Sequence, residues 1–75
     1  MNKRRSFIVG IKSLKLNKKE KIFLKRYRPW GVILFTRNIK NIDQTLELTT
    51  SIRKLFNDKK YPILIDQEGG KVNRL

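Results

Sequence analysis

Apolar residues in this chain gather in three short runs, and two amphipathic segments separate the runs. The runs cover residues 6–11, 31–35 and 61–65. Short, nearly unbroken apolar runs that include β-branched side chains are typical of strands buried on both faces, as in parallel sheets. We therefore predict three strands over these ranges.

The segment after the first run carries the signals of a helix. Asn17 is followed three residues later by Glu20, which is the spacing of a capping box. Apolar residues then form a stripe, with Lys and Arg on the other side of the helix: Ile22, Phe23, Leu24 and Tyr27. Pro29 ends the pattern, because the residue before a proline avoids helical angles. We predict a helix over residues 18–28.

The segment after the second run predicts another helix. Asn41 and Gln44 repeat the capping spacing, and the sequence before them, residues 36–38, is a polar turn. Apolar and small residues follow at helical intervals: Leu46, Thr49, Ile52, Leu55 and Phe56. We predict a helix over residues 42–57.

The predicted order is β-α-β-α-β, which indicates the α/β class. Short connections between apolar strands favour right-handed parallel crossovers. Three strands cannot close a barrel, and a small open sheet of this kind would expose apolar strand edges. A chain of 75 residues forms one small domain at most.

Composition narrows the possible chemistry. The chain has no Cys and no His, which excludes disulfides, thiolate metal sites and the usual general base near neutral pH. The formal net charge is +13. This charge fits a polyanion partner, but it also fits a compositional bias, since the cations are dispersed from Lys3 to Arg74 and Ala is absent.

The amino-terminal pattern does not predict a leader or a membrane span. A basic stretch over residues 3–5 precedes the first apolar run, but Lys12 interrupts that run. A signal peptide needs about 7–15 apolar residues, and a membrane span needs about 20. We expect a soluble, cytoplasmic protein without a membrane partner.

Candidate chemistry lies at the end of the third run. Asp66 and Glu68 are about 6.6 Å apart along an extended chain and point to one side, so they are either a glycosidase pair or a ligand-binding carboxylate beside a turn residue. Residues 69–70 are a Gly pair that lets the backbone approach a ligand but lacks a phosphate-loop pattern. Two carboxylates are too few for a metal site, and we expect neither a metal nor a cofactor.

Several other polar and aromatic residues have two interpretations. Arg74 is either a bidentate ligand-binding residue or a solvated cation, and the same choice applies to Arg37 and Asn38 at the end of the second strand. Tyr27 and Trp30 lie where the first helix meets the second strand, so we interpret them as packing residues.

Two blocks resemble a known family. Residues 66–72, Asp-Gln-Glu-Gly-Gly-Lys-Val, resemble the Asp-Gln-Glu-Gly-Gly-Arg-Val segment of glycoside hydrolase family 3. Residues 31–38, Gly-Val-Ile-Leu-Phe-Thr-Arg-Asn, resemble a second block that is typical of its β-N-acetylhexosaminidase branch. The blocks stand in the family's order and are separated by one amphipathic helix, and the resemblance runs from about Ile8 onward.

The resemblance implies a fold and an activity. The fold would be the amino-terminal β-α-β-α-β portion of a (β/α)₈ TIM barrel, which needs about 250 residues in all. Residues 1–75 would then be a partial domain, truncated after the third strand. Members of this branch remove terminal β-linked N-acetylglucosamine by a retaining mechanism, and in bacteria they act on muropeptide-like saccharides in cytoplasmic peptidoglycan recycling.

The resemblance also assigns residues. It implies that Asp66 holds sugar hydroxyls and that Arg74 contacts the substrate, which replaces the idea of a catalytic Asp66–Glu68 pair. The family's nucleophilic Asp and proton-transferring His lie beyond this segment, and Lys71 stands where the family usually has Arg. We therefore expect the 75-residue chain to bind substrate in part and to be inactive alone.

The sequence is compatible with four kinds of protein. It is a fragment of a β-N-acetylhexosaminidase, a fragment of a family 3 β-glucosidase, a piece that associates with a separately encoded remainder of the barrel, or a small basic protein that binds a polyanion. Nucleic acid is the least favoured partner, because the chain has no recognition-helix motif and no interleaved aromatic platform.

Overall fold

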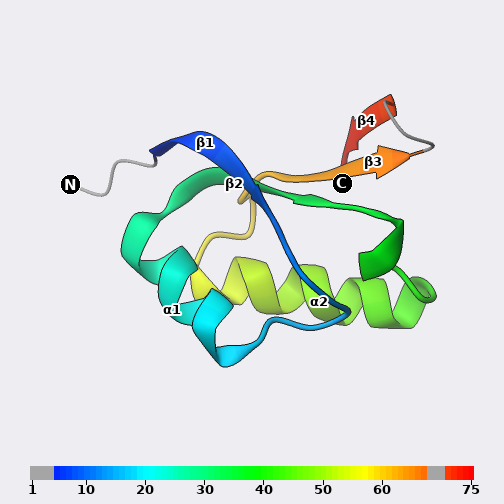
Figure 1. The fold of residues 1–75 in the computed structure, drawn as a ribbon, viewed down its shortest axis with the longest axis horizontal. Helices are drawn as coiled ribbons and strands as arrows, with labels where there is room; N and C mark the ends of the chain where they lie inside the picture. Colours follow the sequence, from blue (N-terminus) through cyan, green and yellow to red (C-terminus); the bar gives the residue numbers. More distant parts are fainter. Residues whose placement is uncertain (1–4, 68–70) are drawn as a thin grey trace.

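The computed structural model describes residues 5–67 and 71–75. Its elements, in chain order, are β1 (Arg5–Gly10), α1 (Lys18–Tyr27), β2 (Pro29–Leu34), the 3₁₀ helix η1 (Thr36–Asn38), α2 (Ile42–Leu55), β3 (Ile63–Gln67) and β4 (Lys71–Arg74) (Figure 1). The α/β class and the β-α-β-α-β order are confirmed.

The four strands form one sheet in the order β1-β2-β3-β4. The pairs β1–β2 and β2–β3 are parallel, as predicted, whereas β4 runs antiparallel to β3. The sequence did not predict β4, because residues 71–74 are mostly polar and lack the apolar pattern of a strand. Their conformation depends on pairing with β3, since strand preference follows context more than residue type.

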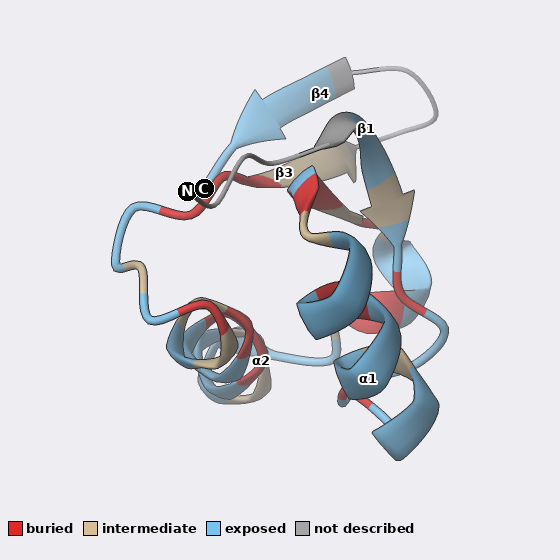
Figure 2. Ribbon diagram, turned by 90° about the vertical axis from the view of Figure 1, so that its left-hand side faces the viewer, coloured by how far each residue is buried: buried red, intermediate tan, exposed pale blue. Residues whose placement is uncertain are grey.

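Both helices lie against the same face of the sheet (Figures 1 and 2). Side chains alternate between the two faces along a strand, so Val32, Leu34 and Ile63 all point to the helix side. There they are fully buried with Leu24 of α1 and Ile52 of α2. The remaining core residues are Ile11, Leu16, Leu48, Phe56 and Tyr61.

The opposite face of the sheet is not covered by either helix. Ile8 on this face is 44% exposed, and Ile33 and Leu64 are only half-buried. The prediction of strands buried on both faces is therefore wrong for the described chain, because its two crossovers place both helices on one side. The open face consists largely of aliphatic side chains.

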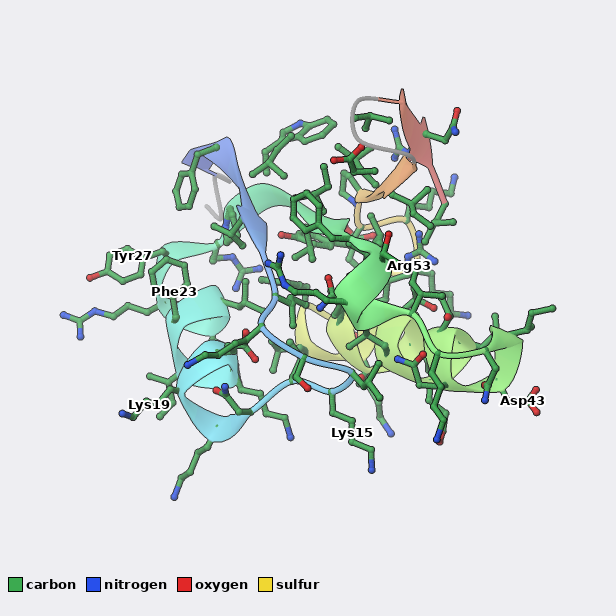
Figure 3. The ribbon with its side chains drawn as sticks, turned by 45° about the vertical axis from the view of Figure 1, so that its right-hand side comes forward. Lys15, Lys19, Phe23, Tyr27, Asp43 and Arg53 are labelled. Carbon is green, nitrogen blue, oxygen red and sulfur yellow. The ribbon has the colours of Figure 1, made fainter. Side chains whose placement is uncertain are left out.

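The apolar stripe of α1 is also mostly exposed. Only Leu24 of the stripe is buried, whereas Ile22, Phe23 and Tyr27 are 58%, 42% and 39% exposed. Phe23 and Tyr27 instead contact each other on the helix surface, with ring centroids 4.9 Å apart (Figure 3). Trp30 is 41% exposed. The interpretation of Tyr27 and Trp30 as packing residues is therefore wrong for the described chain, because each keeps more than a third of its surface exposed.

The predicted helix starts are confirmed. The Asn17 side chain accepts from the Glu20 amide at 2.7 Å, and the Glu20 carboxylate accepts from the Asn17 amide at 3.0 Å. The Asn41 side chain accepts from the Gln44 amide at 2.8 Å, but the Gln44 side chain accepts from the Lys40 amide rather than completing the box. Each helix is thus anchored at its first turn by the residues that the sequence indicated.

The helices end slightly earlier than predicted. Arg28 adopts left-handed angles (φ 45°) after α1, and Asn57 does so (φ 51°) two residues after the end of α2. The Asn57 amide donates to the Lys54 carbonyl and the Asp58 amide to the Arg53 carbonyl, which is the pattern of a Schellman motif.

The third strand begins two residues later than predicted, because Tyr61 has a different role. Its ring is fully buried and stacks on Phe56, with centroids 4.1 Å apart. Its hydroxyl donates to the Pro29 carbonyl at 2.8 Å. Tyr61 therefore joins the end of α2 to the start of β2. Neither helix is long and apolar enough to cross a bilayer, within the part of the chain that the structure describes.

Candidate functional site

Asp66 lies at the carboxyl end of β3. Leu34 pairs with Ile65, so Asp66 comes next to Phe35 where β2 and β3 both end. By the alternation of side chains, Asp66 shares the open face with Leu64 and Ile33. It is half-buried there. A carboxylate at this edge is in the position that parallel α/β sheets use for ligands.

The β3–β4 pair brings Arg74 onto the same face as Asp66, but two residues away. Arg74 is paired with Leu64, and Asp66 is paired with Val72, so the two candidates are diagonal neighbours at about 7–8 Å between Cα atoms. The Arg74 guanidinium makes a long contact of 3.5 Å with the Lys60 carbonyl, which precedes β3. The two side chains therefore share a face, and the Arg74 guanidinium extends toward the chain that precedes β3.

The structure does not test the predictions for the turn that follows Asp66. Glu68 and the Gly pair at residues 69–70 lie outside the described residues. The alternative of an Asp66–Glu68 catalytic pair therefore remains a prediction from spacing. Lys71 belongs to β4 and pairs with Gln67.

Asn38 is a structural residue, and the interpretation as a solvated group is wrong. Its side chain is completely buried. The amide nitrogen donates to the carbonyls of Ile11 at 2.9 Å and Ser13 at 2.6 Å, and the amide oxygen accepts from the Phe35 amide at 2.8 Å. Asn38 thus connects the chain after β2 to the chain after β1.

Gln44 extends this connection, and sequence analysis identified it only as a capping residue. Its amide nitrogen donates to the carbonyls of Leu14 at 2.9 Å and Asn38 at 2.8 Å. Together with Asn38, it holds residues 11–14 against the start of α2. The capping spacing from Asn41 was the only sequence signal for this residue.

Arg37 lies at the same edge and is exposed. Its Nε donates to the Ile11 carbonyl at 3.1 Å, and its guanidinium carbon lies 4.7 Å from the centroid of the Phe35 ring. The structure therefore fixes the orientation of this cation at the carboxyl ends of β1 and β2, although sequence analysis left it undecided between a ligand-binding and a solvated residue.

Arg53 holds the other end of the β3–β4 unit (Figure 3). Its Nε donates to the Tyr61 carbonyl, and its Nη2 donates to the Leu75 carbonyl, both at 3.1 Å. The Leu75 amide in turn donates to the Ile63 carbonyl at 2.8 Å. A single cation from α2 thus anchors the residues on both sides of the strand pair.

The surface has a groove that is separate from Asp66. This groove of about 360 Å³ runs between β1 and α1, with Val9, Lys12, Glu20, Phe23 and Leu24 among its lining residues. No group of three or more acidic residues gathers closely enough to hold a metal ion in residues 5–67 and 71–75. The carboxyl edge therefore offers the Asp66 carboxylate and the oriented Arg37 cation, which suit the hydroxyls and anionic groups of a polar ligand.

Comparison with known proteins identifies relatives of this arrangement. A β-hexosaminidase from Haemophilus influenzae is 39% identical over 69 residues, which cover 92% of this chain and 19% of that relative. A β-hexosaminidase from Alkalilimnicola ehrlichii is also 39% identical over 69 residues. The chain therefore spans about a fifth of the length of the curated relatives that it matches. No protein-family model matches the chain.

Solved structures show the same similarity in three dimensions. The structure of NagZ from Neisseria gonorrhoeae in complex with N-trifluoroacetyl-D-glucosamine superimposes with a TM-score of 0.75 at 36% identity, covering 95% of this chain and 21% of that chain. The native structure of the same protein gives the same TM-score and identity.

Proposed function

We propose that this chain, which belongs with the bacterial β-hexosaminidases in sequence and in fold, forms the amino-terminal part of a retaining β-N-acetylhexosaminidase of glycoside hydrolase family 3. Such an enzyme removes terminal β-linked N-acetylglucosamine. The proposed setting is the recycling of peptidoglycan in the cytoplasm. The observation that carries the proposal is the position of Asp66, at the carboxyl end of β3 on the open face of the sheet.

The arrangement of strands and helices supports a partial (β/α)₈ barrel. In such barrels the helices lie outside, the other face of the strands lines the interior, and active sites form at the carboxyl ends of the strands. The exposed aliphatic residues Ile8, Ile33 and Leu64 would then line the interior. Asp66 would stand at the active-site end.

The proposed roles of the chain's own residues are binding and orientation. The Asp66 carboxylate is an acceptor for sugar hydroxyls, and the Arg74 guanidinium is a donor of several hydrogen bonds. Arg74 reaches the sugar only after it leaves Lys60. That contact is 3.5 Å long and therefore weak, so the rearrangement costs little.

Bond cleavage needs groups that this chain does not supply. In a retaining mechanism a carboxylate attacks the anomeric carbon while an acid protonates the leaving oxygen, and water then releases the sugar from the glycosyl-enzyme. The chain has no His, and we assign Asp66 to sugar binding. We propose that both catalytic groups come from the remaining part of the barrel.

The remainder of the barrel is therefore the proposed macromolecular partner of these residues, whether it continues the same chain or is encoded separately. The open face of the sheet and the outer side of α1 expose apolar side chains that such a partner would cover, including Ile8, Phe23 and Tyr27. A β-glucosidase fragment is not favoured, because the matched relatives are β-hexosaminidases. A polyanion-binding protein is not favoured either, because the cations are dispersed along the chain.

A complementation assay tests the proposal. The 75-residue chain is mixed with the segment of the Haemophilus influenzae β-hexosaminidase that follows its matched residues, and release of the aryl group from an aryl β-N-acetylglucosaminide is measured. We expect turnover from the mixture and none from either part alone. Asp66→Asn should lower turnover at least about tenfold, since it weakens charge-assisted hydrogen bonds.

Asp43→Asn is the matched control, because Asp43 is an exposed carboxylate in the first turn of α2. It should leave turnover unchanged. Turnover by the unmixed chain, or turnover of the mixture that is insensitive to Asp66→Asn, contradicts the proposal. The mass of the cellular product that contains residues 1–75 shows separately whether the barrel is one polypeptide.

A further inference from the structure

A cation occupies the same open sheet face as Asp66, but on the far side of β2. Gly10 pairs with Ile33, so its missing side chain would point to the open face. A Cβ built there would lie 3.2 Å from the Phe35 ring and 3.5 Å from Nη2 of Arg37. The absence of a side chain at Gly10 therefore leaves room for the Phe35 ring and the Arg37 guanidinium above β1.

The orientation of Arg37 is fixed from two sides. Its Nε donates to the Ile11 carbonyl at 3.1 Å, and the guanidinium lies over the Phe35 ring at 4.7 Å. A cation over an aromatic face is stabilised by the negative potential of the ring. The side chain is exposed, and within the described residues its Nη atoms have no hydrogen-bond partner. The two Nη groups of the guanidinium are therefore hydrogen-bond donors that have a fixed orientation on an exposed side chain.

The distance between Arg37 and Asp66 follows from the sheet. Arg37 lies near Gly10 of β1, which is in register with Leu64 of β3 through Ile33. Asp66 is two residues farther along β3, so two strand spacings and two residues place it about 12 Å from Gly10. This separation is longer than one sugar ring. A saccharide whose terminal unit is bound by Asp66 therefore reaches Arg37 only with its next unit.

We propose that Arg37 is a further substrate-binding residue, which binds a carboxylate on the saccharide unit adjacent to the one held by Asp66, with Phe35 as its support. The inference rests on the proposed function of this edge. A guanidinium matches a carboxylate in bidentate geometry, and a fixed side chain loses little entropy on binding. The saccharide preferred at this edge is accordingly an acidic one.

Two disaccharides that differ in one carboxylate test this preference. N-acetylglucosaminyl-N-acetylmuramic acid carries a lactyl carboxylate on its second unit, and N,N′-diacetylchitobiose has a neutral second unit. The isotope-labelled 75-residue chain is titrated with each and followed by NMR. We expect tighter binding of the acidic disaccharide and a shift of the Arg37 Nε–H signal with that ligand only.

Variants separate a substrate contact from a structural effect. Arg37→Gln should weaken binding of the acidic disaccharide roughly tenfold and leave the neutral one unchanged, because only the charge-assisted bonds are lost. Arg37→Lys keeps the charge without the planar fork and should be intermediate. Lys59→Gln removes one positive charge from an exposed turn before β3 and serves as the control. Circular dichroism checks that each variant folds.

The outcomes distinguish this inference from the function on which it rests. Asp66→Asn should weaken binding of both disaccharides alike. If binding depends on Asp66 but Arg37→Gln affects both disaccharides equally, or affects neither, the role of Arg37 is wrong and the proposed function stands. An effect of Lys59→Gln as large as that of Arg37→Gln also overturns it, since the preference would then come from net charge. If neither disaccharide binds the unsubstituted chain, both proposals fail for this chain.

Discussion

The side-chain amide of Asn38 donates to the main-chain carbonyl of Ile11 at 2.9 Å, and this bond joins the carboxyl ends of β2 and β1. The same carbonyl accepts from Arg37 at 3.1 Å. One main-chain oxygen thus positions both residues that follow β2. The segments that follow β1 and β2 at the carboxyl edge of the sheet are therefore held together by a buried polar group.

Asn38→Asp tests this dependence. The substitution keeps the size of the side chain but places a carboxylate oxygen against the carbonyl oxygens of Ile11 and Ser13, where the amide nitrogen now donates. We expect a loss of about 3 kcal/mol in the free energy of unfolding, because two buried carbonyls lose their donor. Urea denaturation followed by circular dichroism measures the change. Asp43→Asn, an exposed exchange between the same residue types, is the control, and an equally small effect of both contradicts the role of Asn38.

Tyr61→Phe isolates a single buried hydrogen bond. The Tyr61 hydroxyl donates to the Pro29 carbonyl at 2.8 Å, whereas its ring packs against Phe56 and would be kept. We expect destabilisation by about 1–2 kcal/mol, since the buried Pro29 carbonyl is left without this partner. Tyr27→Phe is the matched control, because Tyr27 is 39% exposed and its hydroxyl can exchange its partners for water. Equal midpoints in urea for the two variants would rule out the bond as a source of stability.

Gly31→Ala should destabilise the protein more than Gly10→Ala. A Cβ on Gly31 would lie 3.1 Å from the main-chain oxygen of Pro62, which cannot move without shifting the start of β3. A Cβ on Gly10 meets the Phe35 ring, which is a side chain that can rotate. We expect a cost of about 2 kcal/mol for Gly31→Ala, within the range for overpacked sites, and a smaller cost for Gly10→Ala. Thermal denaturation of both variants checks the order, and the reverse order would contradict the packing described here.

Asn57→Gly should stabilise the end of α2. Asn57 has φ 51° in the Schellman motif, a conformation that costs a residue with a Cβ more than it costs glycine. We expect a gain of about 0.5 kcal/mol for Asn57→Gly and a loss of about 1 kcal/mol for Asn57→Ala. We expect the two variants to shift the urea midpoint in opposite directions from that of the unsubstituted protein. Midpoints that move in the same direction would show that the backbone angle is not the cause.

Local sequence patterns determined the elements of this protein and much of their order. Asn17 and Glu20 predicted the start of α1, because a capping box uses only groups within one turn. The apolar run at residues 31–35 predicted a parallel strand, although the strand itself is Pro29–Leu34. The placement of Asp66 at a strand end also followed from the sequence, since a carboxylate directly after a buried apolar run marks the point where the strand leaves the core.

The tertiary structure alone decided which surfaces are covered and which distant groups meet. Phe23 and Tyr27 belong to the same apolar stripe as Leu24. Only Leu24 is buried, because it lies on the side of α1 that faces the sheet. The bonds from Asn38 to Ile11 and from Arg53 to Leu75 join residues more than twenty positions apart. No local pattern specifies such contacts, because they depend on how the crossovers place each loop, and the same placement brings Arg37 and Asp66 to one face.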